Sequence, residues 1–123
     1  MTLETDQIGI FAITPAQIRE VSGKPTTNEV STDDMAFYIN LATGAIIGET
    51  KKSDWNSTDD PISFASLQGA LILYAKSFVL EEFDEKDPTE LKTIRDEFWR
   101  LVKSIKGGVN PGTPTEKAVF YAA

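Results

Sequence analysis

The residues with the clearest potential for chemistry are two pairs of neighbouring aspartates, Asp33-Asp34 and Asp59-Asp60. Carboxylate oxygens are the ligands that Mg²⁺ and Ca²⁺ prefer, but such a site needs several of them to converge on one ion. Both pairs also precede apolar segments with helical periodicity, where an aspartate stabilises the helix N-terminus. The pattern therefore favours helix capping over a metal site, and we expect no cofactor.

Histidine and cysteine are both absent from the 123 residues. Histidine is the usual general base near neutral pH and the commonest metal ligand. Without these two residues the chain cannot perform Ser–His–Asp or Cys–His catalysis, form disulfides or build an ordinary zinc site. Carboxylate, lysine, tyrosine and hard-metal chemistry remain open, and we predict that the chain is not an enzyme.

The acidic residues outnumber the basic ones and give a formal net charge of −7. Such a chain repels the phosphates of DNA, so tight wrapping of DNA is not expected. The densest acidic cluster comprises Glu81, Glu82, Asp84 and Glu85. This cluster is either a solvated turn or a negative patch that contacts a basic partner or lines a passage for DNA.

Four segments carry the sequence signals of a helix start. Each has a capping residue and, in three of them, a proline at the first helical position, where its missing N–H costs nothing. Gln17 completes a capping box with Thr14 in the first segment. We therefore predict an all-α fold, a small bundle of about four helices with extended arms at both ends. The expected starts are Thr14-Pro15, Thr32-Asp33, Asp60-Pro61 and Asp87-Pro88.

The third predicted helix, from Pro61 to about Phe83, is apolar nearly all round and should be roughly 35 Å long. A helix of this kind is buried. A chain of this size cannot easily surround it, so we expect part of its surface to meet another subunit. The segment from Ile62 to Leu80 is rejected as a membrane span because it contains Lys76 and opens with a helix cap.

The second predicted helix carries an apolar stripe at helical spacing, which Phe37, Tyr38, Leu41 and Ile47 are expected to widen. The same segment contains the small residues Ala42, Gly44, Ala45 and Gly48, which suggest close approach of a neighbouring backbone or, alternatively, a hinge. The stripe itself comprises Met35, Ile39, Ala42 and Ile46.

The chain divides into an N-terminal arm (1–12), a helical domain (13–106) and an extended C-terminal arm (107–123). The apolar run at 8–13 suits an extended segment, and the glycines and prolines after residue 106 do not suit a helix. Apolar residues in the arms either fold back on the domain or dock on a partner. Trp55, in the polar loop 49–60, is either packed against the helices or a contact residue. The candidate partner-binding residues are Trp55, Val119, Phe120, Tyr121, Ile10 and Phe11.

A short helix with a Thr-Pro cap precedes an acidic-capped helix, a long apolar helix and a final amphipathic helix that contains the aromatic pair Phe98-Trp99. This order resembles the head–tail connector, or adaptor, proteins of tailed bacteriophages and tailed archaeal viruses. The resemblance covers about residues 13–106 and concerns the layout of the elements. The chain departs from the pattern in having little basic character.

The resemblance implies a structural protein of the virion, located in the neck at the head–tail interface and made in the host cytoplasm. Adaptors form a dodecameric ring, a homo-oligomer under the portal protein, and they dock the next head-completion, stopper or tail protein. The ring extends the channel for genome ejection, and double-stranded DNA passes its lumen without specific binding. No membrane is implied.

Two other classes of function stay open on the residues alone. One is a generic acidic helical binding module, including an inhibitor that imitates DNA and competes with it for a basic enzyme. The other is an enzyme that uses carboxylates and Mg²⁺. Replacing Asp33, Asp34, Asp59 and Asp60 together with alanine would abolish the activity of such an enzyme, whereas helix caps would lose only stability.

Overall fold

The computed structural model of the chain describes residues 1–84 and 87–106. It confirms the all-α class, because the described residues form four α-helices, no strand and one isolated β-bridge. The third helix continues as a π-helical turn, Leu80–Asp84, so that the whole helical segment Pro61–Asp84 has 24 residues. The four helices are α1 (Pro15–Val21), α2 (Thr32–Thr50), α3 (Pro61–Val79) and α4 (Pro88–Lys106).

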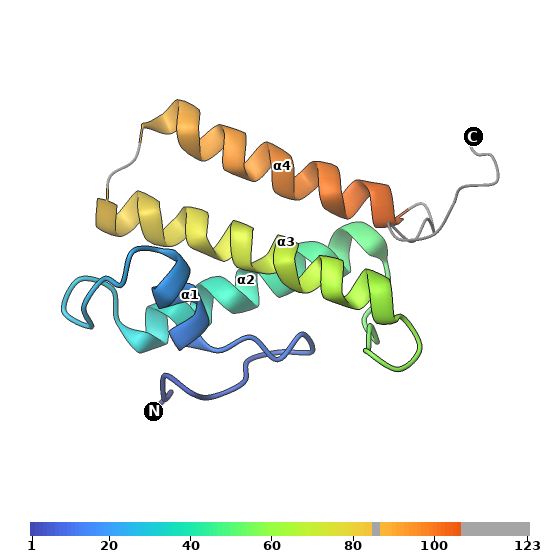
Figure 1. Cartoon of the computed structure of the whole chain (residues 1–123), viewed down its shortest axis with the longest axis horizontal. Coiled ribbons are helices and arrows are strands. Elements are labelled where there is room, and N and C mark those ends of the chain that lie inside the picture. Colours follow the sequence, from blue (N-terminus) through green and yellow to red (C-terminus); the bar gives the residue numbers. More distant parts are fainter. Residues whose placement is uncertain (85–86, 107–123) are drawn as a thin grey trace.

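Helix α3 is the centre of the bundle (Figure 1). It contacts α1 and α2 on one side and α4 on the other, and α2 also reaches α4. By length and composition the segment Pro61–Asp84 is apolar enough to cross a membrane. A core helix passes the same test, and α3 is the helix on which all three others pack.

The start of α1 has the predicted capping box. Thr14 Oγ1 accepts from the Gln17 N–H at 3.2 Å, and Gln17 Oε1 accepts from the Thr14 N–H at 2.8 Å. The predicted cap of α2 was wrong by one residue, because Ser31 and not Thr32 accepts from the Asp34 N–H, at 3.1 Å. Both hydroxyls suit the position chemically, so only the backbone dihedrals of Ser31 decide between them.

The two aspartate–proline starts differ in their hydrogen bonds. Asp87 Oδ1 accepts from the Thr89 N–H at 2.7 Å, as a cap does. Asp60 occupies the N-cap position of α3 but makes no capping hydrogen bond. Its carboxylate instead accepts from the backbone N–H of Asn56 at 3.4 Å and lies 3.8 Å from Lys52 Nζ. Asp60 therefore closes the preceding loop onto the helix start.

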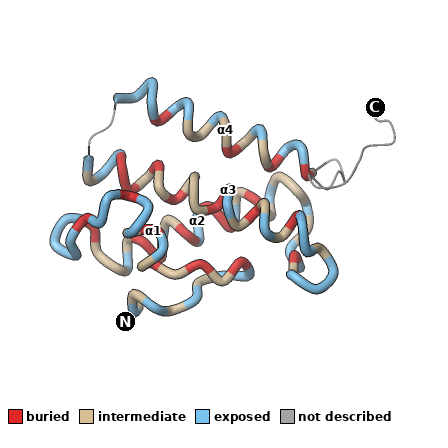
Figure 2. The backbone as a smooth tube through the Cα atoms, viewed as in Figure 1, coloured by how far each residue is buried: buried red, intermediate tan, exposed pale blue. Residues whose placement is uncertain are grey.

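The core lies where the helices face α3, and Figure 2 shows the buried residues of α4 along its edge toward α3. The predicted stripe of α2, Met35, Ile39, Ala42 and Ile46, is fully buried. Partners from the other helices complete one continuous cluster, which is what a single-domain core requires. They include Ile18, Leu67, Leu71, Ala75, Val79, Phe98, Val102 and Ile105.

Residues 8–13 form a tight loop and not the extended segment expected. The Ile8 N–H donates to the Ile13 carbonyl at 2.9 Å, and the chain reverses between them through the positive φ angles of Gly9 and Ala12. The loop presses on α2, since a Cβ on Gly9 would lie 3.2 Å from Thr43 Oγ1. Glycine has no Cβ, so it adopts the φ of +72° and approaches Thr43 this closely with little conformational strain.

Candidate partner-binding surface

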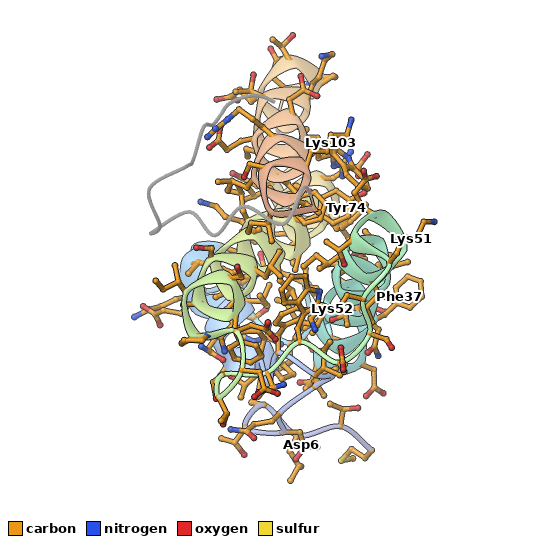
Figure 3. The ribbon with its side chains drawn as sticks, turned by 90° about the vertical axis from the view of Figure 1, so that its right-hand side faces the viewer. Asp6, Phe37, Lys51, Lys52, Tyr74 and Lys103 are labelled. Atoms are coloured by element: carbon orange, nitrogen blue, oxygen red, sulfur yellow. The ribbon has the colours of Figure 1, made fainter. Side chains whose placement is uncertain are left out.

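The side of α2 turned away from the bundle carries exposed apolar and small residues. We call Phe37, Leu41, Gly44 and Gly48 the outer face of α2. Phe37 is 56% exposed and Leu41 is 40% exposed, and both glycines are exposed as well. Figure 3 shows the Phe37 ring projecting away from the other helices. The outer face is therefore an apolar strip that the described part of the monomer leaves uncovered.

Helical geometry separates this strip from the core stripe of the same helix. Residues three and four apart share one side of an α-helix, so 37, 41, 44 and 48 align on one side while 35, 39, 42 and 46 align on another. The expectation that Phe37 and Leu41 widen the buried stripe was therefore wrong. The expectation of a close neighbouring backbone was also wrong for Gly44 and Gly48, because an added Cβ on either would meet nothing within 4 Å. Ala42 lies in the core cluster and Ala45 packs against it.

Aromatic rings join α2 to α3 and α3 to α4. The Tyr38 ring stacks on Phe78 with centroids 5.5 Å apart. Tyr74 stacks on Phe98 at 4.0 Å, and Trp99 meets Phe98 edge-on at 4.9 Å. Contacts of this kind add to the energy of area burial. The Tyr38–Phe78 contact helps to hold α2 on α3, with Phe37 on the neighbouring exposed side.

The acidic cluster at the end of α3 is partly engaged inside the monomer. Glu81 Oε1 accepts from Arg95 Nη2 at 2.7 Å, and the Arg95 guanidinium lies 4.5 Å from the centroid of the Phe78 ring. Glu82 accepts a hydrogen bond from the Tyr38 hydroxyl. Burial, followed by this carboxylate, raises the pKa of Tyr38 above its ordinary range. Asp84 is exposed in the π-helical turn, and Glu85 lies outside the described residues.

Trp55 belongs to the hydrophobic core cluster of the helices and is only 8% exposed, so it is packed and not a free contact residue in this conformation. Its indole N–H donates to Thr50 Oγ1 at 3.1 Å, and Lys52 Nζ lies 5.2 Å from the ring centroid. Lys52 also pairs with Asp54 at 3.1 Å, and this hydrogen bond raises the pKa of Lys52 and lowers that of Asp54. In this conformation the Trp55 side chain supports the loop and offers a partner almost no surface.

The two N-terminal candidates have different surroundings. Phe11 is fully buried, its ring lies 5.3 Å from that of Phe64, and its carbonyl accepts from Gln68 Nε2 at 2.9 Å. A partner cannot reach it in this conformation. Ile10 is 37% exposed beside it. The predicted C-terminal candidates Val119, Phe120 and Tyr121, with the whole arm 107–123, lie outside the described residues.

The two aspartate pairs lie at helix starts. Asp33 and Asp34 occupy the first turn of α2, while Asp59 and Asp60 end the loop before α3. Asp59 receives a hydrogen bond from the Asn56 side-chain amide at 3.1 Å. Within residues 1–84 and 87–106, no group of three or more acidic, histidine or cysteine side chains could hold a metal ion. Asp33, Asp59 and Asp60 accept hydrogen bonds through their carboxylates, whereas Asp34 lies in the first turn of α2.

No protein-family model, no curated protein and no solved structure matches this chain. The arrangement must therefore be interpreted from its own geometry. The sequence interpretation did not recognise the outer face of α2 as a surface. The available signal was that the helix contains a second strip, at 37, 41, 44 and 48, beside the stripe already assigned to the core.

Proposed function

We propose that this chain is a structural subunit of the head–tail connector of a tailed virus. It forms a ring under the portal protein, extends the DNA channel and docks the next neck or tail component. The proposal rests on the order of capped helices over residues 13–106, which resembles that of adaptor proteins. The fold supports it as far as the class, because the four helices and the long central one occur in the order expected.

The observation that carries the proposal is the amount of large apolar side chain left outside a complete core. Val21 at the end of α1 and Ile62 at the start of α3 are both exposed. These two residues lie on different helices. A cyclic ring needs two different surfaces on each subunit, because every copy contacts its two neighbours head to tail. The distribution of these side chains suits such an assembly.

The negative net charge of the chain suits the wall of a channel through which DNA must pass without binding. With a net charge of −7, the subunit offers little attraction for the phosphates of double-stranded DNA. A ring of such subunits would let the genome slide through its lumen without specific binding. We expect the protein to be made in the host cytoplasm and to reside in the virion neck, with no membrane and no catalytic step.

The test is the mass of the assembly that the full chain forms. The purified protein is measured by mass photometry alone and after mixing with the portal protein of the virus whose genome encodes it. We expect a ring of many copies, formed either by the chain alone or only on the portal, and visible in negative-stain micrographs. A small species that ignores the portal and competes with DNA for a basic enzyme would instead establish the DNA-mimic alternative.

The C-terminal arm provides a second measurement for the same proposal. Deleting residues 108–123 should leave the helical far-ultraviolet circular dichroism spectrum and cooperative unfolding unchanged, because the described residues by themselves form one continuous hydrophobic core. Binding to the portal should weaken. Loss of cooperative unfolding in the truncated chain would assign the arm to the core and would contradict its role as a docking segment.

A further inference from the structure

The outer face of α2 is the middle of a longer regular pattern. Six residues follow one another in alternating steps of three and four, which is the spacing of a coiled-coil seam. The two ends of this pattern are charged, with an acid in the first turn of α2 and a lysine at its C-cap. We call these six residues the α2 seam: Asp34, Phe37, Leu41, Gly44, Gly48 and Lys51.

The seam is exposed where it would meet a partner. Phe37 and Lys51 project from the same side of α2, away from the other helices (Figure 3). The space above Gly44 and Gly48 is open. Among the described residues, neither Asp34 nor Lys51 forms an ion pair through its side chain. The bulky residues occupy one half of the seam and the open space occupies the other.

This asymmetry becomes complementary when a second copy of α2 lies antiparallel on the first. In an antiparallel pair the residue number rises along one helix while it falls along the other. Residues that face each other therefore have numbers that add up to the same sum at every layer of the contact. With a sum of 85, Phe37 of one copy lies over Gly48 of the other, and Leu41 lies over Gly44. Each bulky side chain then enters the space above a glycine. A parallel pair with equal numbers opposed would place two Phe37 rings together and leave the glycines facing each other.

The same register also opposes unlike charges. The sum of 85 places Asp34 of one copy opposite Lys51 of the other, at both ends of the pair. Lys51 is the C-cap and has a left-handed φ of 59°, so it extends the seam just past the last helical residue. Antiparallel helices in addition oppose their dipoles favourably. Apolar fit and charge therefore select one register independently.

We propose that the α2 seam is a self-association surface, which binds the α2 seam of a second copy of this chain in antiparallel two-fold symmetry. Such a contact is isologous, since both copies use the same residues. A single pair of helices is smaller than a standard interface of about 1,600 Å², so the affinity is expected to be modest. The pair should therefore form at high micromolar and not at nanomolar concentration.

This inference goes beyond the adaptor proposal. An isologous contact closes on itself and cannot by repetition build a cyclic ring, which needs head-to-tail contacts. The two-fold pair is a state of the free subunit, and a ring would use other surfaces such as those near Val21 and Ile62. Each idea can fail while the other survives.

Cross-linking tests the orientation directly, because the natural chain contains no cysteine. Full-length Phe37→Cys and Gly48→Cys chains are oxidised alone and as an equal mixture, then separated on a non-reducing gel. In the antiparallel pair the two copies of residue 37 lie about 16 Å apart along the helix axis, and so do the two copies of residue 48, which is too far for a disulfide between identical variants. The antiparallel register predicts a cross-linked dimer in the mixture and little with either variant alone. A dimer of Phe37→Cys alone, or no dimer in any sample, would overturn the proposal.

A charge exchange tests the register with sedimentation velocity over a range of concentrations. Lys51→Glu should weaken dimerisation by about tenfold, because the change acts at both ends of the two-fold pair. Adding Asp34→Lys to the same chain should restore it. Lys103→Glu, the same charge change at an exposed position on α4, serves as the control and should leave dimerisation unchanged. Failure of the double variant to recover would exclude this register.

A steric variant distinguishes this surface from the ring contacts. Gly48→Leu fills the open space above the helix, so it should abolish the pair without changing the circular dichroism spectrum. If the chain forms large rings that Gly48→Leu leaves intact and no smaller pair is found, the two-fold contact is refuted and the adaptor proposal stands. If the variant eliminates a dimer but no ring forms with or without the portal, the two-fold contact is supported and the adaptor proposal is refuted.

Discussion

The two faces of α2 both carry large apolar side chains but differ in burial. Met35, Ile39, Ala42 and Ile46 are fully buried against α3 and its neighbours, whereas Phe37 is 56% exposed. Burial of an apolar side chain stabilises the monomer, and exposure contributes nothing until a partner covers it. Hydrophobic residues at helical spacing therefore indicate that a face will be covered, without indicating whether the same chain or another copy covers it.

The largest expected difference between the two faces is in the stability of the monomer. Ile39→Ala removes a fully buried side chain and should lower the free energy of unfolding by about 2–5 kcal/mol. Leu41→Ala removes one that is 40% exposed and should change it by about 0.5 kcal/mol or less. Urea denaturation at low protein concentration measures both. Similar losses in the two variants would mean that the outer face is packed within the monomer.

Polar contacts at the start of α2 tie this helix to the N-terminal segment. The Glu4 carboxylate accepts from Arg19 Nε and Nη2, both at 2.8 Å, and from the Thr32 hydroxyl. Arg19 also donates to the carbonyls of Pro25 and Val30 at 2.7 and 2.9 Å. The hydrogen bond from Arg19, more than that from Thr32, lowers the pKa of Glu4 despite some burial.

Glu4→Gln should therefore destabilise the protein by about 1.5–3 kcal/mol at neutral pH, the usual range for hydrogen bonds to a charged group. The folded-state pKa of Glu4 lies below its unfolded value. Its contribution is therefore fully present above the unfolded-state pKa and is lost as the pH falls through the folded-state pKa. Thermal unfolding from neutral pH to about pH 3 should show the two proteins converging.

Glu97→Gln is the matched control for this measurement. Glu97 also accepts from an arginine, Arg100, whose hydrogen bond lowers the pKa of Glu97, but the pair is exposed on α4. An exposed pair contributes little to stability. Equal sensitivity to pH in both variants would contradict the view that the Glu4 network holds the N-terminal segment on α2.

The fold was predictable because its signals are local. The start of α1 follows from Thr14, Pro15 and Gln17, whose chemistry acts within one turn. The buried stripe of α2 follows from the period of the helix. The one-residue error at Ser31 arose because two adjacent hydroxyl residues suit a cap equally, and the path of the preceding loop decides between them.

The candidate surface was less predictable because burial depends on contacts distant in sequence. Phe11 is buried because the positive φ angles at Gly9 and Ala12 turn the chain back onto α2 and α3, which an apolar run does not report. Trp55 is covered because the loop brings it into the core cluster of the helices, where its indole N–H also finds Thr50. The apolar character of Phe11 and Trp55 in the sequence did not distinguish these buried residues from the exposed Phe37.

The smallest expected effect separates the stability of the monomer from the use of the outer face. Gly44→Ala should raise the free energy of unfolding by about 0.5–1 kcal/mol, because alanine is the better helix former and its Cβ meets nothing within 4 Å. Gly69→Ala, on α3 and equally unobstructed, should give a similar gain. Sedimentation should nevertheless differ between the two, since only Gly44 lies in the α2 seam. We expect Gly44→Ala to weaken the pair by narrowing the space for Leu41 of the second copy, and Gly69→Ala to leave it unchanged. A Gly44→Ala variant that is more stable yet associates less would show that this glycine serves a partner and not the fold. Equal association of both variants would show that Gly44 contributes nothing to binding at the α2 seam.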